Sequence, residues 1–498
     1  MTARPARAAR AARAAHAAHA ARAAHAARAA HAARAAHAAR AAHAARAAHA
    51  AHAGRAARAA LAVLLVLVCA AACTGGAAPE PGNCVLTIAT GVDVSGGVRQ
   101  QVLDRWNAGH PATRACFRTI SPVADEQRGE MMAAAQSGGG AYDVYNLDIQ
   151  WIPEFAQGGH LAALDGWRHE AVAEVPGAVW RAGAWDGVQY AAPFNTDVPL
   201  LFHRADRVRA APRDWAALMA EVRAHAGAAP TRTGLAGQYA AYEGLVVNAM
   251  EAVWAHGGAW AGPEGEVTID TAEGRAGLDA LIQAVRPGSG GGPAAIPPHT
   301  LWHTEDDALT EFREGHALFM RNWAYAYEVL SGEERENRVP FAAEPLPWPG
   351  VLGGQYLAVS AATDHPAEAQ DLVAALTGRE AAARLYHCGG FAPARPSAFT
   401  ATVSCPNRPT PEATASPSAP AQTLSAIAPA GVLEAALRTA RPRPPTPYYT
   451  QFSRLLQDEL HRLLRCHAAG EADCESAAAF ARRVTPLLEA ALDGKISG

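Results

Sequence analysis

A carboxylate and an aromatic ring closely follow one apolar strand pattern. The strand pattern around Val144 ends at Asp148, Trp151 comes three residues later, and a helix is predicted from Pro153 to the glycine pair at 158–159. This order places Asp148 and Trp151 at the C-terminal end of a strand, where open α/β sheets bind ligands. A carboxylate accepts hydrogen bonds from hydroxyls, and a flat ring covers a pyranose face. An ordinary strand-to-helix corner would explain the same residues.

Two later segments offer the same kinds of side chain. Asn195, Thr196 and Asp197 precede the apolar strand predicted at Val198–Phe202, where they could line a cleft or simply form a capped turn. Trp323 and Tyr325 follow the strand pattern that begins at Ala317, and a spacing of two residues points both rings to one face of a strand. They could be a stacking platform or part of the core.

Other chemistry has weaker support. His299 and His303 have the i,i+4 spacing of metal ligands and precede the acidic run 305–307, but the prolines at 297–298 favour an exposed loop or a helix start. We therefore expect no metal and no cofactor. The sequence has no Gly-x-Ser-x-Gly, P-loop or dinucleotide-binding motif. The alternative to a binding protein is a secreted glycoside hydrolase with Asp148 and Asp197 as its carboxylate pair.

The elements that must position these residues alternate between strand and helix. The pattern begins with strand 85–90, helix 98–107 and strand 116–120, which predicts an α/β fold with a parallel sheet covered by helices on both faces. Helical patterns dominate the middle of the chain and its C-terminal end. About 415 residues are too many for one core and enough for two lobes. The stretch 411–422, rich in Pro, Ser, Thr and Ala, is predicted to be a surface insertion.

The N-terminal region does not resemble a fold. Residues 1–58 repeat Ala-Ala-Arg and Ala-Ala-His and have no apolar stripe, so they form a low-complexity tail. Residues 59–73 combine a short apolar run with small residues and end at Cys73. This pattern is typical of a secretory signal followed by a bacterial lipobox, with Cys73 as the lipidated residue. Secretion without a lipid is the alternative.

Charge limits the possible partners, and the cysteine content agrees with an exported protein. The first 60 residues contain 11 Arg and no acid, so the rest of the chain has 32 basic and 47 acidic residues. Such an acidic surface argues against nucleic acid as a partner. Six cysteines follow Cys73, and although 15 pairings are possible we expect disulfides between sequence neighbours. The expected pairs are Cys84–Cys116, Cys388–Cys405 and Cys466–Cys474.

Six segments in order resemble the family 1 extracellular solute-binding proteins of bacterial ABC transporters, and most of all the trehalose/maltose-binding lipoproteins. The segments are 142–165, 187–208, 242–258, 312–330, 353–376 and 441–457. The resemblance implies a periplasmic-binding-protein-like fold of two α/β lobes joined by hinge strands, with a neutral sugar bound in the cleft between them. It implies lobes at 84–196 with 343–391 and at 197–342 with 392–498.

The resemblance also implies roles for individual residues. Asp148 and Asp197 would accept hydrogen bonds from the sugar, Trp323 and Tyr325 would stack on it, and Gly354 would offer backbone at close range. Arg443 would donate from the second lobe, and Glu243 is a further candidate. The implied protein is a monomeric, lipid-anchored receptor outside the cytoplasmic membrane that passes its sugar to a permease. It is not an enzyme.

Overall fold

The described residues all fall within Asn83–Gly498, one of the two units into which the chain divides. In this computed structural model they are 84–138, 140–164, 174–225, 230–262, 266–288, 292–332, 339–405 and 427–495. The Ala/Arg/His tail, the signal region with Cys73 and the insertion at 411–422 lie outside them. Among the described residues, no helix is long and apolar enough to cross a membrane.

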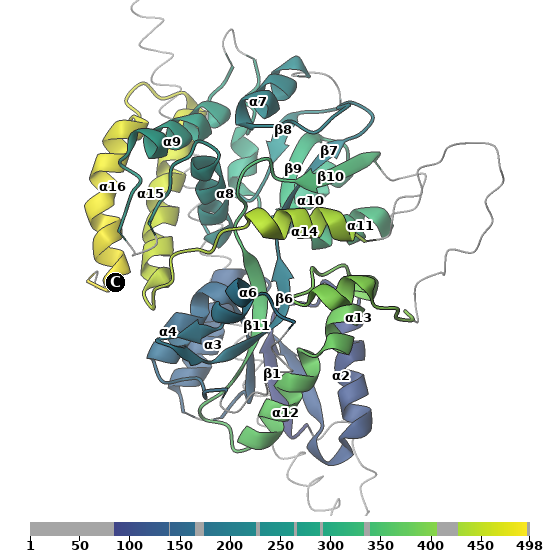
Figure 1. Cartoon of the computed structure of the whole chain (residues 1–498). Helices are drawn as coiled ribbons and strands as arrows, with labels where there is room; N and C mark the ends of the chain where they lie inside the picture. The colour runs from purple at the N-terminus through teal and green to yellow at the C-terminus, as the bar shows by residue number, and fades with distance from the viewer. Residues whose placement is uncertain are drawn as a thin grey trace, which may run out of the picture. The chain divides into compact units, whose positions relative to one another are not determined.

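The first lobe is built on a five-stranded sheet in the order β2-β1-β3-β11-β6 (Figure 1). Strands β1 (Leu86–Thr90), β2 (Ala115–Thr119) and β3 (Val144–Asp148) are parallel. Strand β11 (Gly353–Val359) is antiparallel to both β3 and β6 (Ala191–Asp197). The expected parallel sheet is thus found only in part, because β11 runs against the other four strands.

Helices cover both faces of this sheet, as the alternating pattern predicted. One core packs apolar side chains of the strands against α2 (Val98–Gly109), α12 (Pro366–Leu376) and α13 (Arg379–Gly389). The core on the other face includes side chains from α3 (Ala124–Gln136) and α4 (Ile152–Gln157). The hairpin of β4 (Ala184–Trp185) and β5 (Val188–Gln189) turns at Asp-Gly, where positive φ angles of 48° and 76° match the expected tight turn.

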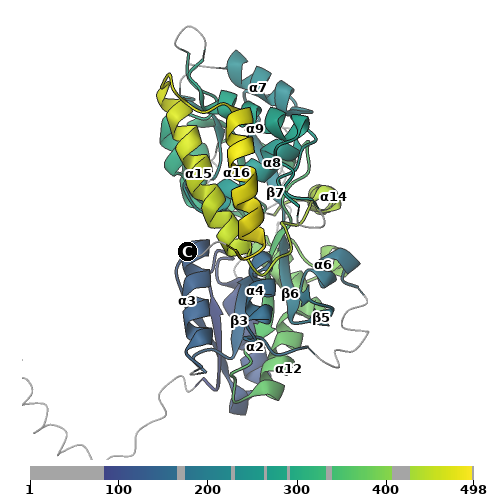
Figure 2. The ribbon, with the colours of Figure 1, turned by 90° about the vertical axis from the view of Figure 1, so that its left-hand side faces the viewer.

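The second lobe has a four-stranded sheet in the order β10-β7-β9-β8. Its strands are β7 (Pro199–Arg204), β8 (Thr233–Ala236), β9 (Ala317–Trp323) and β10 (Phe341–Pro345). A large core on one face includes α7 (Trp215–Ala224), α8 (Glu243–Trp254), α9 (Ala272–Val285), α15 (Tyr449–Ala469) and α16 (Ala477–Leu492). The other face packs on α10 (Glu305–Arg313), α11 (Tyr325–Gly332) and α14 (Ala430–Thr439). Figure 2 shows α15 and α16 side by side along this lobe.

The chain passes between the two sheets through very short connections. β6 ends at Asp197 and β7 begins at Pro199, so Val198 alone separates a strand of the first sheet from a strand of the second. The path returns from β10 to β11 and crosses again after α13, where Thr196 bonds to the backbone oxygen of Ala392. These strands are the hinge of a two-lobed α/β fold. Because β10 spans residues 341–345, it straddles the lobe boundary expected at residue 343.

Asn195, Thr196 and Asp197 form the end of β6 and directly precede β7, close to the strand expected at Val198–Phe202. One local expectation near the hinge was wrong. Tyr325 does not continue the strand of Trp323, because β9 ends at Trp323 and α11 begins at Tyr325. The period-two argument therefore does not explain how these two rings come together.

The three expected disulfides are present. Cys84–Cys116 links the region before β1 to the neighbouring strand β2, Cys388–Cys405 ties the end of α13 to the chain that follows it, and Cys466–Cys474 joins α15 to the loop before α16. Each bond joins cysteines that are neighbours in sequence.

Candidate functional site

A cavity of about 330 Å³ lies where strand ends of the two sheets meet. All seven residues expected to bind the ligand line it: Asp148, Asp197, Glu243, Trp323, Tyr325, Gly354 and Arg443. Its volume is within the range of small-molecule sites, which are commonly a few hundred Å³. The cavity is thus lined by residues from distant parts of the chain, which the two sheets bring together.

The first lobe contributes a wall of hydrogen-bonding groups. Asp148, at the end of β3, accepts hydrogen bonds from Gln355 Nε2 at 3.2 Å and from Gln150 Nε2 at 3.1 Å. Arg99 donates to Thr90 Oγ1 at 2.8 Å and reaches the cavity from the start of α2. The two amides hold the Asp148 carboxylate in place while it faces the cavity.

Gly354 lies at the hinge, beside this polar wall. Its φ of +138° is one that L side chains rarely adopt, and a Cβ there would lie 2.5 Å from the backbone oxygen of Asn195. Glycine is therefore required by the backbone itself at a position that also lines the cavity.

Asp197 ends β6 of the first sheet, Trp323 ends β9 of the second sheet, and the two side chains lie side by side. A Cβ on Gly353 would be 3.3 Å from the Cβ of Asp197 and 3.2 Å from the Trp323 ring, so the glycine leaves room for both. Burial raises the pKa of Asp197 to about 7, although Arg321 and the backbone of Ala324 oppose the shift. The nearby Asp148 raises this pKa further.

Trp323 is held by partners on its face and at its edge. The Arg321 guanidinium lies over the indole, 4.1 Å from the ring centroid, and the indole N–H donates to Glu305 Oε1 at 3.3 Å. Arg321 is in turn fixed by two hydrogen bonds to the buried Glu251, at 2.9 and 2.7 Å. The ring is only partly buried and lines the cavity, so it is a rigid aromatic surface with solvent access.

Glu243 and Arg443 form a buried ion pair at the cavity wall. Arg443 donates to Glu243 Oε1 at 2.9 Å, and the hydroxyls of Tyr449 and Ser453 donate to the same carboxylate at 2.6 and 2.5 Å. Glu243 therefore has both oxygens occupied, and the geometry favours a role in positioning Arg443. Among the described residues, the buried Nε of Arg443 has no hydrogen-bond partner, so one donor is left over beside the cavity.

Several cavity residues were not found by sequence reasoning. They include Arg99, Tyr242, Glu305 and Gln355. Tyr242 donates to Glu305 Oε2 at 2.5 Å, and burial raises the pKa of Glu305. A sequence signal existed for Glu305, because Thr304 and Asp307 form a capping box that begins α10 at this residue.

Trp151, by contrast, is not in the site. It is only 3% exposed and belongs to the core that also contains Phe155 and Tyr356. The expectation that Trp151 accompanies Asp148 at a ligand site was therefore wrong. A 3-10 turn, Ile149–Trp151, follows β3 directly and directs the indole into the apolar layer beneath α4.

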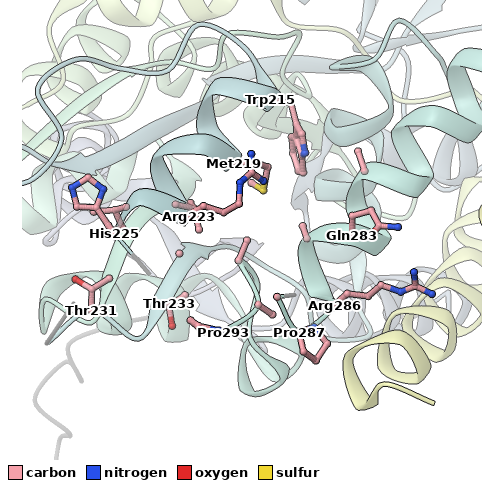
Figure 3. Close-up of a pocket in the computed structure, with 18 of the residues that line it drawn as sticks. Trp215, Met219, Arg223, His225, Thr231, Thr233, Gln283, Arg286, Pro287 and Pro293 are labelled. Carbon is pink, nitrogen blue, oxygen red and sulfur yellow. The ribbon is translucent and has the colours of Figure 1, made fainter. Parts of the chain in front are cut away.

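A second, larger cavity of about 720 Å³ lies within the second lobe. Figure 3 shows Trp215 and Met219 from α7 and Gln283 from α9 among its lining side chains. Three arginines and one histidine line it, and its described lining includes no carboxylate and none of the seven expected ligand residues. Its described lining is therefore basic, whereas the lining of the interlobe cavity is mainly acidic.

Comparison with known proteins identifies the family. Residues 119–421 match the model of the bacterial extracellular solute-binding protein family. A Deinococcus radiodurans protein described as "Probable ABC transporter-binding protein" is 31% identical over 259 residues, which cover 48% of this chain and 59% of that protein. An uncharacterized lipoprotein of Streptomyces antibioticus is 32% identical over 30% of this chain and 33% of its own length. The chain thus spans less than two thirds of either relative.

Solved structures share the fold. Maltose-bound T. maritima MalE3 has a TM-score of 0.69 and 22% identity, over 81% of this chain and 98% of that one. UgpB from Mycobacterium tuberculosis, in complex with glycerophosphocholine, has a TM-score of 0.64 and 16% identity, over 84% of this chain and 100% of its own. The chain belongs to the bacterial extracellular solute-binding protein family, which is a family of binding proteins and not of enzymes.

Proposed function

We propose that this member of the extracellular solute-binding protein family is the receptor of an ABC importer and binds a neutral sugar, such as the disaccharides trehalose or maltose, between its lobes. The observation that carries the proposal is the meeting of Trp323 with Asp148 and Asp197 in one cavity. Sugars present hydroxyls that need hydrogen-bond acceptors and ring faces that suit an aromatic surface. The cavity offers both from opposite lobes.

The contacts suggest a role for each residue. Trp323 and Tyr325 would cover a sugar ring, and the two aspartates would accept hydrogen bonds from its hydroxyls. Arg443 would donate through its unpartnered Nε, held in place by Glu243. Gly353 and Gly354, which have no side chain, would let the sugar approach the backbone of β11. Because each lobe supplies part of the site, binding would favour the closed arrangement of the lobes by a hinge motion.

The maltose bound to the T. maritima neighbour supports a disaccharide, but the same fold holds glycerophosphocholine in another neighbour. The fold alone therefore does not choose the ligand. The lining of the cavity supports a sugar, because its carboxylates suit the hydroxyls of a sugar better than a phosphate.

The test is a melting-temperature screen of the purified protein against mono- and disaccharides. A sugar that binds only the folded protein should stabilise it by about 2.7 kcal/mol at a hundredfold excess over its dissociation constant. A shift with glycerophosphodiesters or peptides and none with any sugar would contradict the sugar proposal. Release of new reducing ends from an oligosaccharide would instead indicate a hydrolase.

Location is a separate part of the proposal. We propose that the protein acts outside the cytoplasmic membrane as a monomer held by a lipid on Cys73, and that the unit beginning near residue 84 binds the sugar. Replacement of Cys73 by Ala should release the protein into the medium. Retention of Cys73→Ala at the membrane would mean that another segment holds it.

A further inference from the structure

Two histidines and a glutamate meet on the surface of the second lobe, away from the residues assigned to the sugar. They are His299 in the 3-10 turn Pro298–Trp302, His303 directly after that turn, and Glu311 in α10. One possible ligand atom from each lies within 4.8 Å of the other two. The sequence suggested residues 305–307 as the acidic partners of these histidines, and the structure provides Glu311 instead.

The capping of α10 explains this exchange of partners. The backbone N–H and the hydroxyl of Thr304 donate hydrogen bonds to the Asp307 carboxylate in a capping box, and Glu305 lines the sugar cavity. Glu311 lies six residues beyond Glu305 along α10 and is only 5% exposed at its side chain. It faces His299, which is 43% exposed. The cluster therefore has one buried anionic ligand and an opening to solvent.

One measured distance matches a tetrahedral metal ion. His299 Nε2 lies 3.3 Å from Glu311 Oε1, and two ligands about 2.1 Å from a tetrahedral zinc ion are about 3.4 Å apart. Among the described residues, His303 Nδ1 is buried without a hydrogen-bond partner. Two imidazoles, one carboxylate and a water are a ligand set that zinc takes in proteins.

The carboxylate is already oriented by its neighbours. Thr233 Oγ1 donates to Glu311 Oε1 at 2.6 Å, and Arg232 donates to both oxygens, to Oε1 at 3.1 Å and to Oε2 at 2.9 Å. Hydrogen bonds of this kind fix the carboxylates that bind metals. The Arg232 charge opposes a cation, but its side chain is 58% exposed and therefore well solvated. A zinc ion on the histidine side of Oε1 would leave the contact between Arg232 and Oε2 in place.

We propose that His299, His303 and Glu311 bind a zinc ion, with water as the fourth ligand. The site is independent of the sugar, but His303 immediately precedes Thr304 and Glu305, which line the sugar cavity. A metal here would join the turn before α10 to the body of that helix.

The experiment measures the melting temperature of the full chain with ZnCl₂ and with EDTA. The variants are His299→Ala, His303→Gln and Glu311→Gln, each compared with its own metal-free sample. His225→Ala is the matched control, because His225 pairs with Glu221 at 3.7 Å and belongs to no described three-ligand cluster. Zinc that binds the tail histidines equally well before and after the folded unit melts does not shift the melting temperature.

Zinc should raise the melting temperature of the wild type and of His225→Ala. Each of the three cluster variants should lose the shift, with zinc affinity lowered by about tenfold or more. The proposal is overturned by a wild type that zinc does not stabilise. It is equally overturned by a zinc shift that survives in all three cluster variants, or by a shift that His225→Ala removes.

Discussion

The two walls of the interlobe cavity differ in chemistry. The first lobe offers mainly hydrogen-bonding groups, such as Arg99, Asn146, Asp148 and Gln355. The second lobe offers Trp323 and Tyr325 with a framework of charged residues behind them. A polar wall determines where hydroxyls can lie, whereas an aromatic wall supplies contact area. The two walls should therefore respond differently to substitution.

The largest expected effect tests the buried ion pair between Glu243 and Arg443 in the second wall. Glu243→Gln leaves Arg443 as a buried charge without its partner, which should lower the free energy of unfolding by about 3–5 kcal/mol. Chemical denaturation measures this loss. Glu380→Gln is the control, since the Glu380–Arg105 pair is exposed and should change stability by less than about 1 kcal/mol. Equal losses in the two variants would mean that the buried pair has no special role.

Two tryptophans test whether the aromatic surface belongs to the second wall alone. Trp151→Ala should lower the free energy of unfolding by about 3–5 kcal/mol, because it empties the core beside α4. The folded fraction should keep its sugar affinity. Trp323→Ala should instead weaken sugar binding by about thirtyfold, the equivalent of about 2 kcal/mol. Melting temperature and affinity, measured on the same samples, would contradict this distinction if both variants lost only stability.

The hinge glycine between the walls should show a smaller effect. Gly354→Ala forces a Cβ to within 2.5 Å of the Asn195 oxygen at a strained φ, and should lower the free energy of unfolding by about 1–3 kcal/mol. Gly431→Ala is the control, because it lies in α14 with no atom within 4 Å of the added Cβ. Thermal unfolding should show Gly431→Ala to be neutral or slightly stabilising. A neutral Gly354→Ala would show that the hinge backbone tolerates side chains.

The smallest effect is a pH dependence of binding. With a pKa of about 7, Asp197 is partly protonated at neutral pH in the free protein, where Arg321 and Asp148 are the charges that act on it. If the sugar hydroxyls donate to the ionised form, affinity should rise between pH 5.5 and 7.5, by at most about tenfold per pH unit. Calorimetric titration measures this, and Asp197→Asn should bind weakly with no such dependence. A flat wild-type profile would remove Asp197 from the contacts.

The same titration has a consequence for the free protein. The folded state holds a proton on Asp197 up to about pH 7, whereas the unfolded chain releases it near the ordinary value of 3.8. This group alone therefore lowers stability as the pH rises from about 4 to 7. Asp197→Asn should flatten that part of the stability profile.

The sequence could predict the elements, because strand patterns and strand ends are local features. The family resemblance supplied the seven expected ligand residues, all of which line the cavity. The sequence placed the helices at residues 98 and 366 correctly, and Asp148 at the end of a strand. It could not predict that the Trp151 ring lies in the core, since only the 3-10 turn after β3 decides where the ring points. It also missed the antiparallel direction of β11, which depends on a pairing between strands that are about 200 residues apart.

Residues such as Glu305 and Glu311 show why sites are harder to predict than elements. Both lie in one helix, yet one faces the sugar cavity and the other faces His299. The capping box fixes where α10 begins, but the packing of α10 on β9 decides which side chain reaches which site. That packing joins the helix to a strand whose neighbours lie far away in the sequence.

The most direct test of the account is a crystal structure of the protein with the sugar that gives the largest melting-temperature shift. We predict that a sugar ring stacks on Trp323, with hydroxyls within hydrogen-bonding distance of Asp148 and Asp197. A sugar bound instead in the cavity beside Trp215 and Arg223, with the interlobe cavity empty, would contradict the central claim.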